Sequence, residues 1–158
     1  MAGRMTLEAA VVADVQELSA ESDQIGRVFA GLHALSLNDF RALLHVMVAE
    51  RAGRPLSAGD LRDLMGVSGA AITYLVERMI TSGHLRREAH PTDRRKVLLK
   101  YADHGVEVGE SFFNPLTRHS HRALADLPDE DLAAAHRVLG AVLGAMRAFR
   151  SDLASCPE

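Results

Sequence analysis

LSAGDLRDLMGVSGAAITYLVERMITSGHLRREAHPTDRRKVLLKYADHG, residues 56–105, carries the strongest secondary-structure signals of the chain. Ser57 and Asp60 form a capping pattern ahead of a short apolar run that Gly66 ends, which predicts a helix of about two turns. Ser68 is then placed to cap a second helix. Two helices joined by so tight a connection are typical of a helix-turn-helix motif.

The second of these helices has an apolar face and a polar face. In a helix-turn-helix, the second helix offers its N-terminal half to a DNA groove. Helical spacing predicts that Ile72, Leu75, Val76 and Met79 are buried, which leaves Ala70, Thr73, Tyr74 and Glu77 facing outward.

A basic hairpin follows at Gly83, where the pattern changes to the length and partial alternation of strands. His84–Glu88 and Lys96–Tyr101 are the expected strands, with His90–Asp93 between them. Between His84 and Lys100 lie six cations and two acids, which gives +4 against −7 elsewhere. This concentration indicates a local anionic partner, although a solvated charged face is the ordinary alternative. A helix-turn-helix followed by a basic hairpin is the winged-helix layout.

Helical patterns flank this region on both sides. A helix is expected at about 38–51, and long apolar stripes predict further helices from Leu7 and from the acidic turn at Asp129. Pro115 is expected to kink or break the helix after the hairpin. The two terminal stripes are longer than a small core can cover, so part of each is expected to meet another chain.

Composition bounds the remaining possibilities. The 158 residues are 47% hydrophobic, which suits one compact domain, and no run of about 18 to 20 apolar residues indicates a membrane span. With no signal-peptide pattern, a cytoplasmic location is expected. The single cysteine, Cys156, excludes a disulfide within one chain, and His119 and His121 diverge on a helix. We therefore expect no metal and no cofactor, and no nucleophile or phosphate-loop motif indicates an enzyme.

The stretch quoted above resembles the winged helix-turn-helix of the MarR-type transcriptional regulators, over roughly residues 36–105. The helix termini, the segment SGAAITYLVERM at residues 68–79 and the D-x-R pair Asp93 and Arg95 carry the resemblance. Two features depart from the family pattern: His84 stands where an apolar residue is commoner, and the dipeptide at residues 101–102 is Tyr-Ala where Leu-Thr is usual.

The resemblance implies a mainly α fold: a winged helix-turn-helix with a two-stranded β wing and N- and C-terminal dimerisation helices. The expected division is 1–35 for the N-terminal dimerisation helix, 36–102 for the DNA-binding domain and 103–158 for the C-terminal dimerisation helices. It implies a homodimer on a pseudo-palindromic operator in double-stranded DNA, with recognition helices in major grooves about 34 Å apart. The implied function is a transcriptional regulator, most simply a ligand-responsive repressor.

On the recognition helix, five residues are expected to contact DNA. Ser68 and the free N–H groups of the first turn can reach phosphate, and small residues allow close approach to the groove. Thr73 and Tyr74 are candidates for base-edge or methyl contacts, although Thr73 could be an exposed filler and Tyr74 could pack on its own helix. The expected contacts are Ser68, Gly69, Ala70, Thr73 and Tyr74.

In the wing, the resemblance places Arg95 in the minor groove, where a narrow A·T-rich groove suits a guanidinium. Asp93 is expected to orient an arginine, either Arg95 or Arg78, with simple capping of the turn as the alternative. Three more cations complete the predicted DNA contacts: Arg87, Arg94 and Lys96.

The family's effector site lies between the dimerisation helices and the DNA-binding lobe, so His33, His45 and Phe112 are candidate contacts for a small aromatic effector. Two other functions stay open on the sequence. The chain could be a winged-helix module for protein interaction that binds no DNA, or a dimer that binds small molecules. Steep salt dependence of DNA binding would separate a regulator from both.

Overall fold

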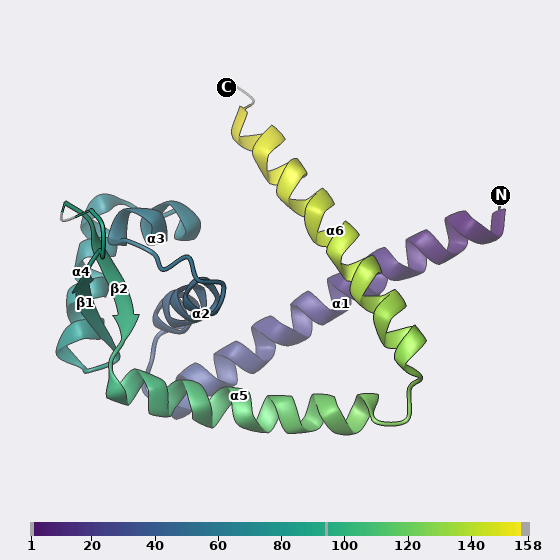
Figure 1. Cartoon of the computed structure of the whole chain (residues 1–158), viewed down its shortest axis with the longest axis horizontal. Coiled ribbons are helices and arrows are strands. Elements are labelled where there is room, and N and C mark those ends of the chain that lie inside the picture. Colours follow the sequence, from purple (N-terminus) through teal and green to yellow (C-terminus); the bar gives the residue numbers. More distant parts are fainter. Residues whose placement is uncertain (1, 94, 156–158) are drawn as a thin grey trace. The chain divides into compact units, whose positions relative to one another are not determined.

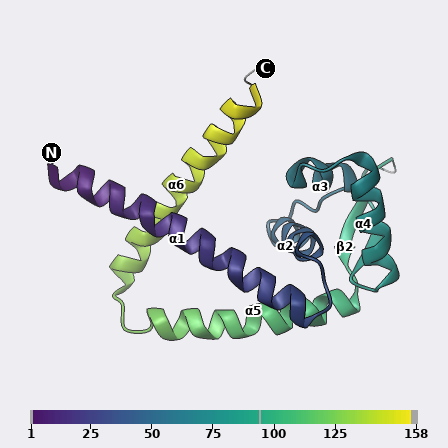
Figure 2. The same ribbon diagram turned by 180° about the vertical axis from the view of Figure 1, so that it is seen from behind.

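The computed structural model describes residues 2–93 and 95–155 and confirms a mainly α winged helix-turn-helix with a two-stranded wing (Figure 1). The elements in chain order are α1 (Ala2–Leu32), α2 (Leu37–Arg51), α3 (Ala58–Met65), α4 (Gly69–Thr81), β1 (Leu85–Ala89), β2 (Val97–Tyr101), α5 (Asp103–Leu124) and α6 (Asp129–Ser155). Helix α4 follows α3 after a tight turn, as the sequence predicts (Figure 2).

Polar caps begin the three helices, α2, α3 and α4, of the central region, residues 37–101. Ser57 accepts from the N–H of Asp60, and the Asp60 carboxylate accepts in return from the N–H of Ser57, so α3 has a complete capping box. Gly66 ends α3 in the left-handed conformation with φ 64°, which a residue without Cβ adopts easily. The Ser68 hydroxyl accepts from the N–H of Ala71 and caps α4. These predictions are confirmed.

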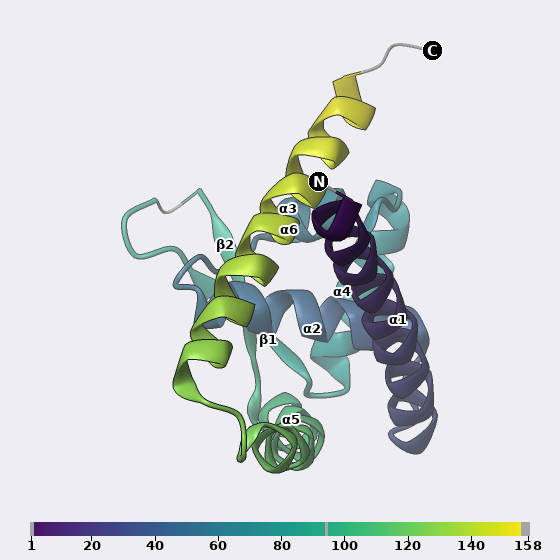
Figure 3. The same cartoon turned by 90° about the vertical axis from the view of Figure 1, so that its right-hand side faces the viewer.

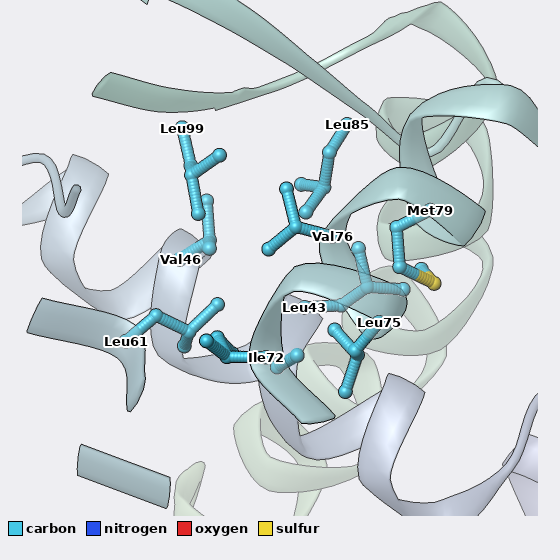
Figure 4. Close-up of a cluster of buried hydrophobic side chains, with 10 residues drawn as sticks. Leu43, Val46, Leu61, Ile72, Leu75, Val76, Met79, Leu85 and Leu99 are labelled. Atoms are coloured by element: carbon cyan, nitrogen blue, oxygen red, sulfur yellow. The ribbon is translucent and has the colours of Figure 1, made fainter. Parts of the chain in front are cut away.

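The core lies within this central region and joins α2, α3, α4 and both strands (Figure 4). Its largest side chains are almost wholly removed from water, which supplies the main stabilisation of the domain. The buried cluster consists of Ala42, Leu43, Val46, Leu61, Ile72, Leu75, Val76, Met79, Leu85 and Leu99. All four positions predicted for the inner face of α4 belong to it.

The wing is an antiparallel hairpin in which Leu85 pairs with Tyr101 and Ala89 with Val97. Figure 3 shows both strands of this hairpin. Alternation along the second strand predicts that Val97 and Leu99 form its anchoring face. Leu99 is buried as predicted, but the prediction is wrong for Val97, which is 46% exposed, while its neighbour Leu98 is buried. The residue before α3, Ser57, bridges to Leu98 and covers the other edge of β2.

Contacts divide the chain into two compact units, Met1–Asn114 and Pro115–Glu158. The predicted division at residues 36 and 103 falls where α2 and α5 begin. Helix α5 continues through Pro115 without a break, contrary to one of the two expectations for this residue. A proline removes only one backbone donor, and the rest of the helix keeps its own hydrogen bonds.

The terminal helices leave their apolar side chains in contact with water. No residue of α6 is buried, and Leu139, Leu143 and Met146 are among its large exposed side chains. By length and composition alone, α6 is long and apolar enough to cross a membrane. Such a helix needs an apolar partner, which another helix or a bilayer can supply equally well.

Candidate nucleic-acid interface

The outer face of α4 is the first part of the candidate interface. Ser68, Gly69 and Ala70 are exposed at its N-terminus, where the first backbone N–H groups have no partner within the helix. These three residues have small side chains or none. This end of α4 can therefore approach a phosphate or a groove floor closely.

Thr73 and Tyr74 occupy the same face one turn further on. The Thr73 hydroxyl donates to the carbonyl of Gly69 at 2.8 Å, so its methyl group and the two lone pairs of its oxygen remain available for contacts with DNA. Tyr74 is 68% exposed, and the guanidinium carbon of Arg78 lies 5.2 Å from its ring centroid. The alternative of a ring packed on its own helix thus describes Tyr74 in part, while most of its surface stays accessible.

Arg78 pairs with Asp39 of α2 and not with Asp93 of the wing, which corrects one of the two pairings expected for Asp93. Burial alone would raise the pKa of the Asp39 carboxyl, but hydrogen bonds from Arg78 and Ser36 hold it below its usual value. The same bond raises the pKa of Arg78. Local sequence gives no signal for this pair, whose members are 39 positions apart.

Asp93 caps the turn at the wing tip, which was the alternative reading of this residue. Its carboxylate accepts from the backbone N–H of Arg95 at 3.1 Å, and Nδ1 of His90 accepts from the N–H of Asp93 at 3.1 Å. Lys96 closes the loop by donating its N–H to the carbonyl of Asp93. These three hydrogen bonds hold the backbone of Asp93, Arg95 and Lys96 in the turn.

The side chains of Arg95 and Lys96 are exposed on this turn. They can reach a nucleic acid without first being released from a buried site. Arg94, the third predicted cation of the tip, lies outside the described residues. The groove and phosphate contacts assigned to all three stay predictions.

Arg87 lies on β1 and connects the wing to the outer face of α4 through Glu77. Its guanidinium donates to the Glu77 carboxylate at 2.6 Å, and both side chains are about half exposed. The hydrogen bond raises the pKa of Arg87 and lowers that of Glu77. An exposed pair of this kind stabilises the fold little. Arg87 can therefore leave Glu77 and pair with a phosphate at a small cost in free energy. Sequence reasoning placed Glu77 outward but did not find this pairing.

Two of the three effector residues predicted from the family, His33 and Phe112, belong to an aromatic cluster. Phe112 contacts Phe29, Phe40 and Phe113, with ring centroids 4.7, 5.3 and 4.7 Å away, and the ring of His33 stacks 4.1 Å from Phe29. The gap among these rings is about 10 Å³, which has room for a single water at most. His45 lines neither this gap nor the larger cavity nearby.

A larger cavity of about 260 Å³ opens between α2, the end of β2 and the first half of α5. Its polar walls include Glu50 and Arg51, and Phe113 supplies an aromatic surface. The guanidinium carbon of Arg51 lies 5.1 Å from the Phe113 ring centroid. The remaining lining residues, which sequence reasoning missed, are Met47, Tyr101, Gly105, Val106, Gly109, Glu110 and Asn114.

Glu50 adds an unusual feature beside this cavity. One carboxylate oxygen accepts from Lys100 Nζ at 3.2 Å, whereas the other is buried and has no hydrogen-bond partner among the described residues. A buried oxygen without a partner is unfavourable, so a donor from a ligand would be stabilising. For metals, residues 2–93 and 95–155 place no three His, Cys, Asp or Glu side chains together as an ion site.

The comparisons with known proteins agree with this geometry. A model of the MarR family matches residues 33–96. The chain is 30% identical over 78 residues to YcgE of Bacillus subtilis (strain 168), an uncharacterized HTH-type transcriptional regulator, and spans about half of its length, 51%. The structure of transcriptional regulator Tm0710 from Thermotoga maritima matches with a TM-score of 0.59 at 24% identity, over 88% of this chain and 95% of that one.

A mutant of S. aureus MepR bound to an oligodeoxyribonucleotide has the same fold. It matches with a TM-score of 0.54 at 13% identity, over 85% of this chain and 96% of that one.

Proposed function

We propose that this chain is a MarR-family, sequence-specific DNA-binding transcriptional regulator that acts as a homodimer in the cytoplasm. The observation that carries the proposal is the pairing of two exposed surfaces in one unit. The outer face of α4 presents Thr73 and Tyr74, while the wing turn presents Arg95 and Lys96. The first surface suits base edges in a major groove and the second suits phosphates and a minor groove.

The fold shared with a DNA-bound MepR structure supports this assignment at the level of architecture. Charge supports it independently, because a chain of net charge −3 concentrates cations on its hairpin. The acidic remainder would then confine contact with DNA to one face.

The uncovered apolar side chains of α1 and α6 support the proposed homodimer. Leu18 and Val28 of α1 are exposed, as are Leu143 and Phe149 of α6. Covering these residues with the same helices of a second copy would remove them from water. Two-fold symmetry then predicts an operator with two related half-sites about one helical turn apart.

We also propose that a small aromatic effector binds in the 260 Å³ cavity beside α2 and α5 and lowers affinity for the operator, as expected of a repressor. Phe113, Arg51 and the unpaired oxygen of Glu50 offer a ring, a cation and an acceptor. A ligand needs a differential affinity of only about 1 to 3 kcal/mol to change the affinity for the operator by roughly 5- to 150-fold. A thermal-shift screen of phenolic acids and other aromatics should reveal stabilising ligands.

Selection from a random duplex library tests DNA binding directly. We expect an enriched motif with two related half-sites, bound with an affinity that falls steeply as salt rises. No enrichment and no shift at low salt would contradict the proposal and favour a protein-interaction module. Ligand stabilisation without DNA binding would favour a small-molecule-binding dimer instead.

A further inference from the structure

Asp39 is a buried carboxylate that serves two helices at once. It occupies the third position of α2, is 4% exposed and accepts from the N–H of Ser36 at 2.9 Å through one oxygen. Its other oxygen accepts from the guanidinium of Arg78 on α4. The capping box fixes the first oxygen, so the second has a defined direction.

Arg78 links Asp39 to the outer face of α4. Its guanidinium is held by Asp39 and lies 5.2 Å from the ring centroid of Tyr74, four positions earlier on the same helix. A charge-assisted hydrogen bond restricts a long side chain far more than an exposed pairing does. The guanidinium therefore stays beside the ring and favours one orientation of it.

We propose that Asp39 is a positioning residue for base recognition: it holds Arg78, and Arg78 fixes the ring of Tyr74 for contact with DNA. This inference rests on the proposed DNA-binding function. An exposed tyrosine without such support would sample several rotamers, and these would have to be restricted when DNA binds. The free protein instead holds the ring in place in advance.

A purely electrostatic role for Asp39 makes the opposite prediction. Asp39→Asn removes one negative charge, which by itself strengthens binding to any DNA. The positioning role predicts weaker binding to the selected operator, by roughly two- to fivefold, the effect of losing a cation–π contact. It also predicts weaker discrimination at the base pair below Tyr74, with binding to a shuffled duplex unchanged or slightly tighter.

The chain supplies a matched control. Asp63 on α3 is exposed and pairs with its neighbour Arg62, so Asp63→Asn makes the same charge change without touching α4. We expect Asp63→Asn to shift affinity for the operator and for the shuffled duplex equally. If Asp39→Asn also shifts both equally, in either direction, the positioning role is wrong.

The geometry can be tested without DNA because Tyr74 and Tyr101 are the two tyrosines of the chain. With 3-fluorotyrosine incorporated, ¹⁹F NMR should show two resonances, and Tyr74→Phe identifies one of them. Asp39→Asn should move the Tyr74 resonance and leave that of Tyr101, whose hydroxyl donates to the Leu43 carbonyl, in place. An unmoved Tyr74 resonance would overturn the proposal.

Arg78→Lys provides a second route if Asp39→Asn fails to fold. Lysine keeps a charge opposite Asp39 but lacks the planar guanidinium, so the Tyr74 resonance should still move and discrimination should still fall. Retention of both wild-type properties would count against the inference. If the wild type binds neither duplex, the proposed function fails, whereas the ¹⁹F result still decides whether Asp39 positions Tyr74.

Discussion

The central region, residues 37–101, and helix α6 differ in whether they bury their apolar side chains. The central region buries ten residues in one cluster, whereas α6 buries none of its own. The first therefore reaches its fold within one chain, and the second needs a partner. This contrast predicts that dimer formation and the fold of the DNA-binding region can be disrupted separately.

The largest effect is expected from a charge in the exposed stripe of α6. Leu143→Glu places a carboxylate where the proposed dimer excludes water, so the dimer should dissociate while the central region stays folded. Loss of simultaneous binding to two half-sites should lower operator affinity on the order of 100-fold. Light scattering and fluorescence anisotropy measure the two consequences.

Ala141→Glu is the matched control for this variant. Ala141 is also exposed on α6 but lies about 200° away from Leu143 around the helix. The Ala141→Glu variant should remain dimeric and bind the operator. Equal dissociation of both variants would show that the apolar stripe does not define the interface.

Within the unit Met1–Asn114, Gly105→Ala should have the next largest effect. A Cβ at this position would lie 2.0 Å from the carbonyl oxygen of His84 and 2.7 Å from the ring of Tyr101, so α5 would be forced off the base of the wing. We expect the free energy of unfolding to fall by about 1 to 3 kcal/mol. Chemical denaturation of the dimer at fixed protein concentration provides the measurement.

Gly109→Ala, one turn later on α5, tests whether the close approach is responsible. A Cβ there meets no atom within 4 Å, and alanine favours a helix interior over glycine by about 0.5 to 1 kcal/mol. This variant should be as stable as the wild type or more so. A loss equal to that of Gly105→Ala would refute the steric explanation.

A smaller effect is expected in the wing, where neither the fold nor the dimer depends on the side chain. Arg95→Ala should weaken operator binding most at A·T-rich flanks and lower the slope of log affinity against log salt by about 1. Thr73→Ala should instead alter base preference within the half-site. Equal losses on all sequences for both variants would contradict this division between α4 and the wing.

The smallest effect concerns pH and the buried His84. Burial, together with the neighbouring His104, lowers the pKa of His84, so the folded chain takes up a proton less readily than the unfolded chain. Stability should be complete above the ordinary histidine pKa of about 6.5 and should fall as the pH drops below it. His45 should add to this loss of stability at low pH, because burial lowers its pKa too.

His84→Leu should make this dependence shallower. The variant removes an imidazole whose Nε2 is buried without a hydrogen-bond partner among the described residues. Thermal midpoints between about pH 7.5 and 5 provide the test. His121→Leu, at an exposed position of α5, should keep the wild-type slope, and a wild-type slope in His84→Leu would contradict the assignment.

Local signals explain why much of the fold could be predicted. The caps Ser57 and Ser68, the stop at Gly66 and the helical spacing behind them act over a few residues, and the structure has each of them as expected. In the hairpin the period of two predicted the strands but assigned Val97 to the anchoring face, because pairing between Ser57 and Leu98 is not a local property.

The candidate site was less predictable because its key contacts join distant positions. The local sequence indicates only a capping role for Asp39. The tertiary fold brings Arg78 to its second oxygen. Likewise, Glu50 and Phe113 belong to different helices, and no spacing rule indicates that they line one cavity. Residue type and helix face located the exposed candidates Thr73 and Tyr74, whereas partners and cavities required the tertiary structure.

A hydroxyl-radical footprint of the dimer on its selected operator tests whether paired α4 helices recognise the DNA. We expect two protected segments related by a two-fold axis, with centres about one helical turn apart and further protection at the flanks where the wings lie. Arg95→Ala should remove the flanking protection alone. A single asymmetric segment, or protection that does not depend on sequence, would contradict recognition by paired α4 helices.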